Sequence, residues 1–220
     1  MVPKTADNPE HGSAGNRTVQ DEHDIAALLF RWGHARDCDD WETLAACFHD
    51  DATIHISWIS APAAEFVARS REQASKRKPG SHTKHLIGGP WIEVNRDRAF
   101  ARCHVNLYIR AQVEGHDFDV QSWFRFFDLL EKRARVWRIV KRTAVYEKDR
   151  MDPVDPRGVP DSLFAAALND VDFSAFPPAA KFLCYLQQLS GRATMTDMVS
   201  VYSDEEAALA AAGRDWLAGG

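Results

Sequence analysis

The chain has 220 residues, a formal net charge of −5 and an apolar content of 45%, values typical of one globular domain with a substantial core. The slight excess of acidic residues argues against nucleic acid or an anionic membrane surface as a partner. Four widely spaced cysteines without a CxxC motif, and a start without an apolar signal segment, favour a reduced protein of the cytoplasm.

Three helices and one strand are predicted in the first part of the chain. In the first helix, apolar residues recur at helical spacing after acids in the first turn. Asp40 is placed to cap the second helix, and Pro62 stands near the start of the third, where a missing N–H costs nothing. The expected elements are a disordered tail at 1–18, helices at 19–36 and 41–48, a strand at 52–59 and a helix at 60–77.

Four strand-like runs follow, joined by short polar connections that suit antiparallel neighbours. They cover residues 85–94, 98–114, 118–132 and 135–148. Helices followed by a long meander predict an α+β fold, in which one curved antiparallel sheet packs against the N-terminal helices. Such a fold leaves a pocket between the concave face of the sheet and the helices.

The character of the sequence changes after residue 148. A segment with three prolines, 149–160, precedes two predicted helices around 177–190 and 203–220. We therefore expect a sheet domain at 19–148 and a helical C-terminal extension at 149–220. Apolar residues in both helices indicate that the extension docks on its own domain, on a neighbouring subunit, or over the mouth of the pocket.

One carboxylate is a candidate for chemistry among the six acidic residues between Arg36 and Ile56. The others fit helix caps, a turn and solvent-facing charge. Asp37 differs because it stands at the C-terminal end of the long first helix, where the helix macrodipole disfavours a negative charge. We expect another interaction to hold it there.

His85 is the second candidate. It follows a glycine turn, begins a strand at the rim of the expected pocket and can titrate near neutral pH. Spacing alone does not connect it to Asp37. The remaining candidate histidines show no metal-binding spacing, so we expect no metal; they are His34, His49, His55, His82 and His116.

Three segments together resemble the scytalone dehydratase-like branch of the SnoaL-like group in the nuclear transport factor 2-like superfamily. They are "RDCDDWETLAACF" (36–48), "SAPAAEFV" (60–67) and "KHLIGGPWIEV" (84–94), and the similarity extends over residues 20–147. This group also contains bile-acid dehydratases, lindane dehydrochlorinase and polyketide cyclases. The resemblance implies a cone-shaped α+β barrel around a largely apolar pocket, in a homodimer or homotrimer, with no metal or organic cofactor.

The resemblance also implies a catalytic pair, since an Asp at the end of the first long helix hydrogen-bonds a His on the sheet. The matching residues are Asp37 and His85. The carboxylate would fix the imidazole tautomer and stabilise its cation, so that His85 removes a proton from carbon or from a phenol.

This sequence departs from the scytalone dehydratase pattern at three polar pocket positions. Ile109 stands where a second histidine is expected, Phe126 falls near the position of an asparagine, and Arg36 replaces the tyrosine before the catalytic Asp. These changes argue against scytalone itself as the substrate.

The faces of the strand at 98–113 decide which residues meet a substrate. The resemblance places its apolar residues in the pocket and its polar residues on the outer face, where subunits meet. A one-residue shift would instead bring His104, Tyr108 and Arg110 to the substrate. Lys141 or Arg142 could bind an oxyanion. The expected substrate-binding residues are Arg36, Trp41, Ile56, Leu107, Ile109, Phe124, Phe126 and Lys141.

These residues predict a cofactor-independent lyase that acts on an aromatic or polycyclic small molecule. The group expelled would be water, a halide or a one-carbon fragment; formaldehyde release is suggested by analogy with lyases of lignin-derived compounds. An isomerase or cyclase that uses the same pair, and a non-catalytic binding protein, are the alternatives.

Overall fold

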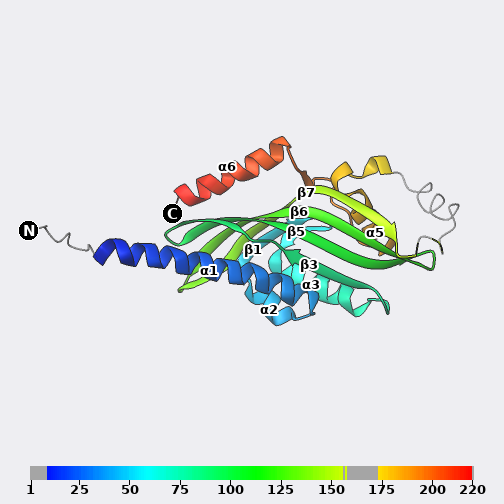
Figure 1. Ribbon diagram of the computed structural model, residues 1–220, viewed down its shortest axis with the longest axis horizontal. Coiled ribbons are helices and arrows are strands. Elements are labelled where there is room, and N and C mark those ends of the chain that lie inside the picture. The colour runs from blue at the N-terminus through cyan, green and yellow to red at the C-terminus, as the bar shows by residue number, and fades with distance from the viewer. Residues whose placement is uncertain (1–8, 156, 158–172, 220) are drawn as a thin grey trace, which may run out of the picture.

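The computed structural model describes residues 9–155, 157 and 173–219 (Figure 1). Residues 1–8 of the expected tail, and most of the segment after the sheet, lie outside the described residues. The first helix begins at Pro9, ten residues before the predicted start, so part of the expected tail is helical.

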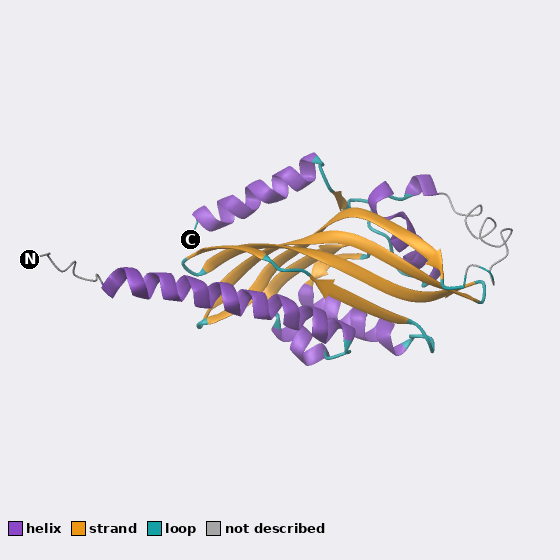
Figure 2. Cartoon of the chain, in the orientation of Figure 1, coloured by secondary structure: helices purple, strands orange, loops and turns teal. Residues whose placement is uncertain are grey.

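The described elements alternate briefly between helix and strand before the long strands begin (Figure 2). The first part comprises α1 (Pro9–Asp37), α2 (Trp41–Ala46), β1 (Phe48–Ile56), β2 (Ile59–Pro62) and α3 (Ala63–Ser75). The central part comprises β3 (His82–Ile87), β4 (Trp91–Asn95), β5 (Arg98–Val113), β6 (His116–Arg133) and β7 (Val136–Pro153). The last part comprises 3₁₀ turns at Phe173–Ala175 and Pro178–Ala180, α5 (Lys181–Leu189), β8 (Val199–Ser200) and α6 (Asp204–Ala218).

The strands form one curved sheet that does not close, with the order β2-β1-β7-β6-β5-β3. Strand β4 pairs with β5 beside β3, and β8 pairs with β7. Neighbours are antiparallel except at β1–β7 and β7–β8. Register shifts between β6 and β7 leave one extra residue on β7 opposite Trp123–Phe124 and another opposite Leu129–Leu130, and these bulges bend the long strands. The predicted α+β class, with a curved sheet on N-terminal helices, is confirmed.

Two predicted strands are each divided in the structure. The first is a hairpin of β1 and β2 with a turn at Ser57 and Trp58. The second is interrupted by Gly88–Pro90, since proline cannot donate a ladder hydrogen bond. Pro62 has an extended ψ of 143° and caps α3, so this helix begins at Ala63, later than predicted.

The main core lies between the concave face of the sheet and helices α1 to α3, as Figure 1 shows. In β5 the apolar residues point into this core: Cys103 and Val105 are buried, whereas His104 is exposed. The shifted alternative is therefore wrong for His104 and Tyr108, which lie on the outer face. The apolar alternation of β5 explains the observed orientation, because it fixes the register in which the apolar residues face the core.

The C-terminal extension packs on its own sheet at two places. Helix α5 joins the main core through Leu183, Cys184 and Tyr185. Helix α6 covers the opposite face, where Leu209 and Leu217 pack against a smaller cluster of buried residues (Figure 1). That cluster consists of Phe100, Phe127, Val145 and Val199.

None of the described helices combines the length and the apolar content that a membrane crossing requires.

Candidate active site

The candidate site lies where the C-terminal end of α1 approaches strand β3. This approach depends on Gly33, since a Cβ atom there would lie 2.8 Å from Cγ1 of Ile87. The helix ends at Asp37, and Asp39 then takes a left-handed φ of 59° that turns the chain away. The end of α1 is thereby held against the backbone of β3.

Asp37 binds His85 through both carboxylate oxygens. Oδ1 lies 2.6 Å from Nδ1 of the His85 ring, and the backbone N–H of His85 donates to Oδ2, also at 2.6 Å. These two bonds offset the unfavourable macrodipole at the end of α1, which explains why a carboxylate is stable at this position.

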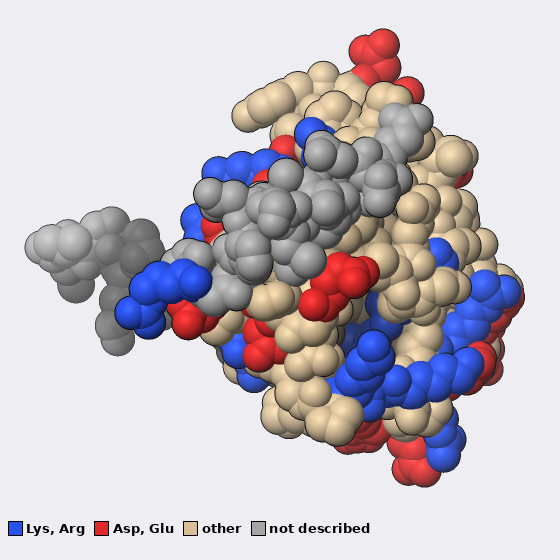
Figure 3. Space-filling view, turned by 90° about the vertical axis from the view of Figure 1, so that its right-hand side faces the viewer, with Lys and Arg blue, Asp and Glu red and all other residues tan. Residues whose placement is uncertain are grey.

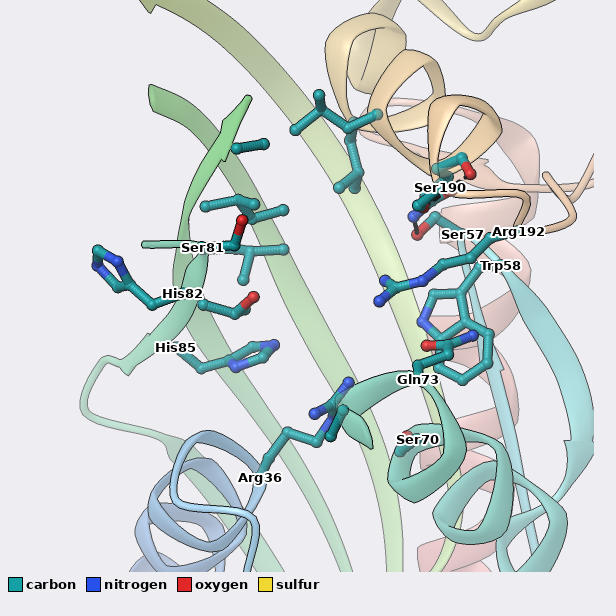
Figure 4. A pocket seen from close by; sticks show the side chains of 18 of the residues that line it. Arg36, Ser57, Trp58, Ser70, Gln73, Ser81, His82, His85, Ser190 and Arg192 are labelled. Atoms are coloured by element: carbon teal, nitrogen blue, oxygen red, sulfur yellow. Dashed lines mark hydrogen bonds between the residues drawn. The ribbon is translucent and has the colours of Figure 1, made fainter. Parts of the chain in front are cut away.

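The two hydrogen bonds fix the state of the imidazole. Because a carboxylate only accepts hydrogen bonds, Nδ1 must carry a proton, and Nε2 of the neutral ring keeps a free lone pair. Figure 4 shows the His85 ring extending into the cavity between Arg36 and the opposite wall. A basic nitrogen is therefore presented to whatever occupies the cavity.

Burial keeps this imidazole neutral. The side chains of His85 and Asp37 are only 10% and 6% exposed. Desolvation by burial lowers the pKa of His85 below its ordinary value of 6.5, and this effect outweighs the opposing hydrogen bond and charge of Asp37. Near neutral pH the group can thus accept a proton, as a general base must.

The cavity that His85 faces has a volume of about 470 Å³. Aromatic rings form much of its wall: Trp32 meets the His85 ring edge-on with centroids 5.5 Å apart, and it also meets Phe126 at 5.1 Å. Phe124, Tyr146 and Trp58 extend the aromatic wall. Such a wall suits a flat, largely apolar ligand.

The structure brings six of the eight expected substrate-binding residues to the cavity lining. These are Arg36, Ile56, Leu107, Ile109, Phe124 and Phe126. Arg110, expected only for the shifted register, also borders the cavity, although its guanidinium pairs with Asp119.

Two expected substrate-binding residues lie outside the lining. Trp41 supports Arg36 instead, with its ring 5.8 Å from the guanidinium carbon. Lys141 is exposed, because neighbouring residues of β7 alternate between the faces and Arg142 takes the inward position.

Arg142 is not available to bind a substrate oxyanion. Its guanidinium is 1% exposed and forms a bidentate pair with Asp128, at 2.7 Å for both bonds. It also lies 4.3 Å from the Trp32 ring centroid and 4.0 Å from that of Phe126. This buried pair supports the aromatic wall from behind.

The lining also contains residues from α5 and the loop after it that the sequence did not indicate. Gln187 donates a hydrogen bond from Nε2 to Oγ of Ser57 at 2.6 Å, and the Ser57 N–H donates to the hydroxyl of Tyr146 at 2.8 Å. Arg192 follows in the same loop. Helical periodicity identified α5, but no local signal connects residues 187–192 with a cavity whose lining residues before α5 lie between 32 and 146.

Within the described part of the chain, no three His, Cys, Asp or Glu side chains come together as metal ligands would.

Comparison with known proteins finds one matching family model and several relatives. The profile of the SnoaL-like domain matches residues 17–143. Pea pathogenicity protein 2 of Fusarium vanettenii is 31% identical over 180 residues, which cover 79% of this chain and 72% of that protein. Scytalone dehydratase of Colletotrichum orbiculare is 33% identical over 89 residues, which cover 37% of this chain and 47% of that enzyme.

A solved structure shows the same fold. The protein from Novosphingobium aromaticivorans, described as nuclear transport factor 2-like with a cystatin-like fold, aligns with a TM-score of 0.53 and 21% identity. The alignment covers 73% of this chain and 97% of that protein.

Proposed function

The chain belongs to the SnoaL-like family, and from that premise we propose that it is a cofactor-independent lyase acting on an aromatic or polycyclic small molecule. The family relationship suggests small-molecule lyase or isomerase chemistry. The observation that carries the proposal is the buried Asp37–His85 pair, which presents a neutral imidazole nitrogen to an aromatic-walled cavity.

The proposed reaction is a proton-initiated elimination. Nε2 of His85 accepts a proton from a C–H or phenolic O–H of the substrate, and the released electron pair forms a new double bond as the bond to the leaving group breaks. The imidazolium, stabilised by Asp37, then returns its proton to a departing oxygen. For a hydroxyl leaving group the product is an alkene when a carbon loses the proton and a quinone methide when a phenol loses it, with water released in both cases, so atoms and charge balance.

Three kinds of leaving group fit this proposal. Water and halide leave with the electron pair of the bond that breaks, and with a halide the imidazolium then gives its proton to solvent. Formaldehyde leaves by a fragmentation instead: His85 accepts the proton of a hydroxymethyl O–H, the oxygen forms the C=O bond of formaldehyde, and the electrons of the broken C–C bond form the new double bond as a neighbouring hydroxyl departs as water. An isomerase or cyclase would use the same base without expulsion, and its product would keep the mass of the substrate. Mass measurement therefore separates the two reaction classes.

The test is a screen of two- and three-ring aromatic alcohols, halides and diaryl compounds with the purified protein, followed by mass spectrometry. We expect conversion of at least one class with loss of the corresponding small molecule. Asp37→Asn should lower kcat by roughly 10²–10⁴-fold. If the Asn oxygen keeps the backbone bond to His85, its amide N–H₂ faces Nδ1, which favours the wrong imidazole tautomer.

Asp50→Asn is the matched control, since Asp50 is an exposed carboxylate on β1. It should convert substrate at the wild-type rate. Equal activity of Asp37→Asn and Asp50→Asn would contradict the proposed role of the pair. Tight ligand binding without conversion by the wild type would favour the non-catalytic binding protein.

A further inference from the structure

The charge of the cavity wall is opposite to the charge of the chain. Six of the described lining residues are Lys or Arg and none is Asp or Glu, although the whole sequence carries a net charge of −5. Figure 3 shows Lys and Arg side chains gathered around a hollow on one face of the molecule. The cationic lining residues are Arg36, Lys76, Arg77, Lys78, Arg110 and Arg192.

Most of these cations are exposed or already paired. Arg77 forms a bidentate pair with Asp39, Arg110 pairs with Asp119, and Lys76 pairs with Glu72. Lys78 is exposed. Their positive charge is therefore largely neutralised or screened by water.

Arg36 and Arg192 differ from the others. Both are half-buried, and neither is paired with an acidic side chain of the described residues. Arg36 lies over the rings of Trp41 and Phe66, and Arg192 lies over Trp58 at 5.7 Å. Figure 4 shows the two guanidinium groups pointing into the same space from opposite walls, beside the His85 ring.

The chain fixes the position of Arg192 through the end of α5. Gly191 has a left-handed φ of 69°, its N–H donates to the carbonyl of Gln188, and the N–H of Arg192 donates to the carbonyl of Gln187 at 2.8 Å. This is a Schellman motif, which sets the direction of the chain after a helix. Arg192 is thus directed into the cavity by a defined backbone turn.

The electrostatics of both groups favour the binding of an anion. Burial, with a contribution from Arg192, lowers the pKa of Arg36 to about 10, although the charges of Asp37 and Asp39 oppose this shift. Burial also lowers the pKa of Arg192, with a contribution from Arg77. Desolvated guanidinium groups that form no ion pair with the described residues are favourable sites for an anion, which relieves their mutual repulsion.

We propose that Arg36 and Arg192 bind a carboxylate of the substrate, so that the ligand is an aromatic carboxylate whose reacting carbon lies against His85. A planar carboxylate matches the fork of a guanidinium, and the aromatic wall takes the rings. This inference rests on the proposed function for the reacting carbon only. It also makes the C-terminal extension a part of the binding site, since Arg192 lies outside the matched family domain.

The test compares two probes of almost equal shape, 2-naphthoate and the neutral 2-naphthamide, by calorimetric titration of the full chain. We expect the carboxylate to bind at least tenfold more tightly. Arg36→Gln and Arg192→Gln should each lower the affinity for 2-naphthoate by roughly 10–100-fold, while the affinity for the amide changes little. Arg36→Lys and Arg192→Lys should recover part of the loss.

Arg150→Gln controls for the change of net charge, because Arg150 is exposed and pairs with Asp152 at the surface. It should bind both probes as the wild type does. Circular dichroism should show that each variant is folded before it is compared. Equal affinity of the wild type for the two probes, or equal losses in the Arg150 and Arg192 variants, would overturn the carboxylate site.

The result of this binding test is independent of the result of the activity test of the proposed function. Asp37→Asn should keep the preference for the carboxylate, because Asp37 is engaged with His85 rather than with the two arginines. A preference for 2-naphthoate in a protein that converts no substrate would uphold the site and reject the lyase. Conversion of a substrate without a preference for 2-naphthoate would uphold the lyase and reject the carboxylate site.

Discussion

At the scale of single residues, the site depends on a small number of contacts that each have a physical reason. Gly33 permits the approach of α1 to β3, and Asp37 satisfies the ring and the backbone of His85 together. The free Nε2 follows from these bonds, since the only N–H of the neutral ring, on Nδ1, donates its hydrogen bond to the carboxylate. Loss of the small residue at 33 would therefore separate a pair that is otherwise intact.

The pH dependence of kcat/KM should report the titration of His85. Because burial lowers its folded-state pKa below 6.5, the active neutral form predominates above that pH and is lost as the pH falls. We expect kcat/KM to rise with pH, to reach half its maximum below pH 6.5 and to stay level through pH 7.5. Circular dichroism at each pH would separate titration from unfolding, and an acid limb centred above pH 7 would contradict this assignment.

At the scale of elements, the two C-terminal helices have different roles. Asp149 of β7 accepts a hydrogen bond from the N–H of Leu183 at 2.8 Å, which holds the first turn of α5 against the main core. Gln187 and Arg192 then reach the cavity. Helix α6 covers the opposite face of the sheet, so we assign it a structural role.

Mutations in helix α6 should therefore lower the stability of the protein and leave its activity nearly unchanged. A Cβ at Gly213 would lie 2.6 Å from three atoms of the Phe100 ring, so Gly213→Leu should lower the free energy of unfolding by roughly 1–3 kcal/mol in a urea titration. Ala212→Leu is the control, because Ala212 is exposed on the same helix. We expect both variants to retain kcat/KM within about twofold; equal stability of the two would contradict the packing of α6 described above.

At the scale of the whole molecule, the C-terminal extension and the sheet form one body, and thiol reactivity should report this. Cys38 is exposed, whereas Cys47, Cys103 and Cys184 are buried. Burial raises the pKa of Cys184 in α5 to about 12, with Asp149 adding to the effect. We expect one thiol to react rapidly with a disulfide reagent in the native protein, and all four after denaturation. A second rapid thiol that disappears in Cys184→Ala would show that α5 leaves the core.

The sequence predicted the helices and strands of this molecule better than the contacts between them. The alternation in β5 was sufficient to predict which face is apolar, and helical spacing was sufficient to find α5 and α6. The division of β3 from β4 was missed because Gly88 and Gly89 permit either a continuous strand or a break, and Pro90 decides for the break. Long strands of alternating polarity thus carry more information than short ones.

The candidate site was predictable only where a family pattern joined distant residues. Asp37 and His85 are 48 positions apart, and no propensity or period connects them. The same limit applies to Arg192, which reaches the cavity through a Schellman turn. It also applies to the choice between Lys141 and Arg142, because tertiary packing decides which face of β7 turns inward. Contacts of this kind depend on tertiary packing, which single-sequence patterns do not encode.

The most direct test of the central claim is the tautomer of His85, read by long-range ¹H–¹⁵N NMR of the labelled protein at pH 7. His85→Gln assigns the signals among the nine histidines. We predict a neutral ring with its proton on Nδ1 and an unprotonated Nε2, and a shift toward the other tautomer in Asp37→Asn. A ring in the wild type that is doubly protonated, or that carries its proton on Nε2, would contradict the proposed base.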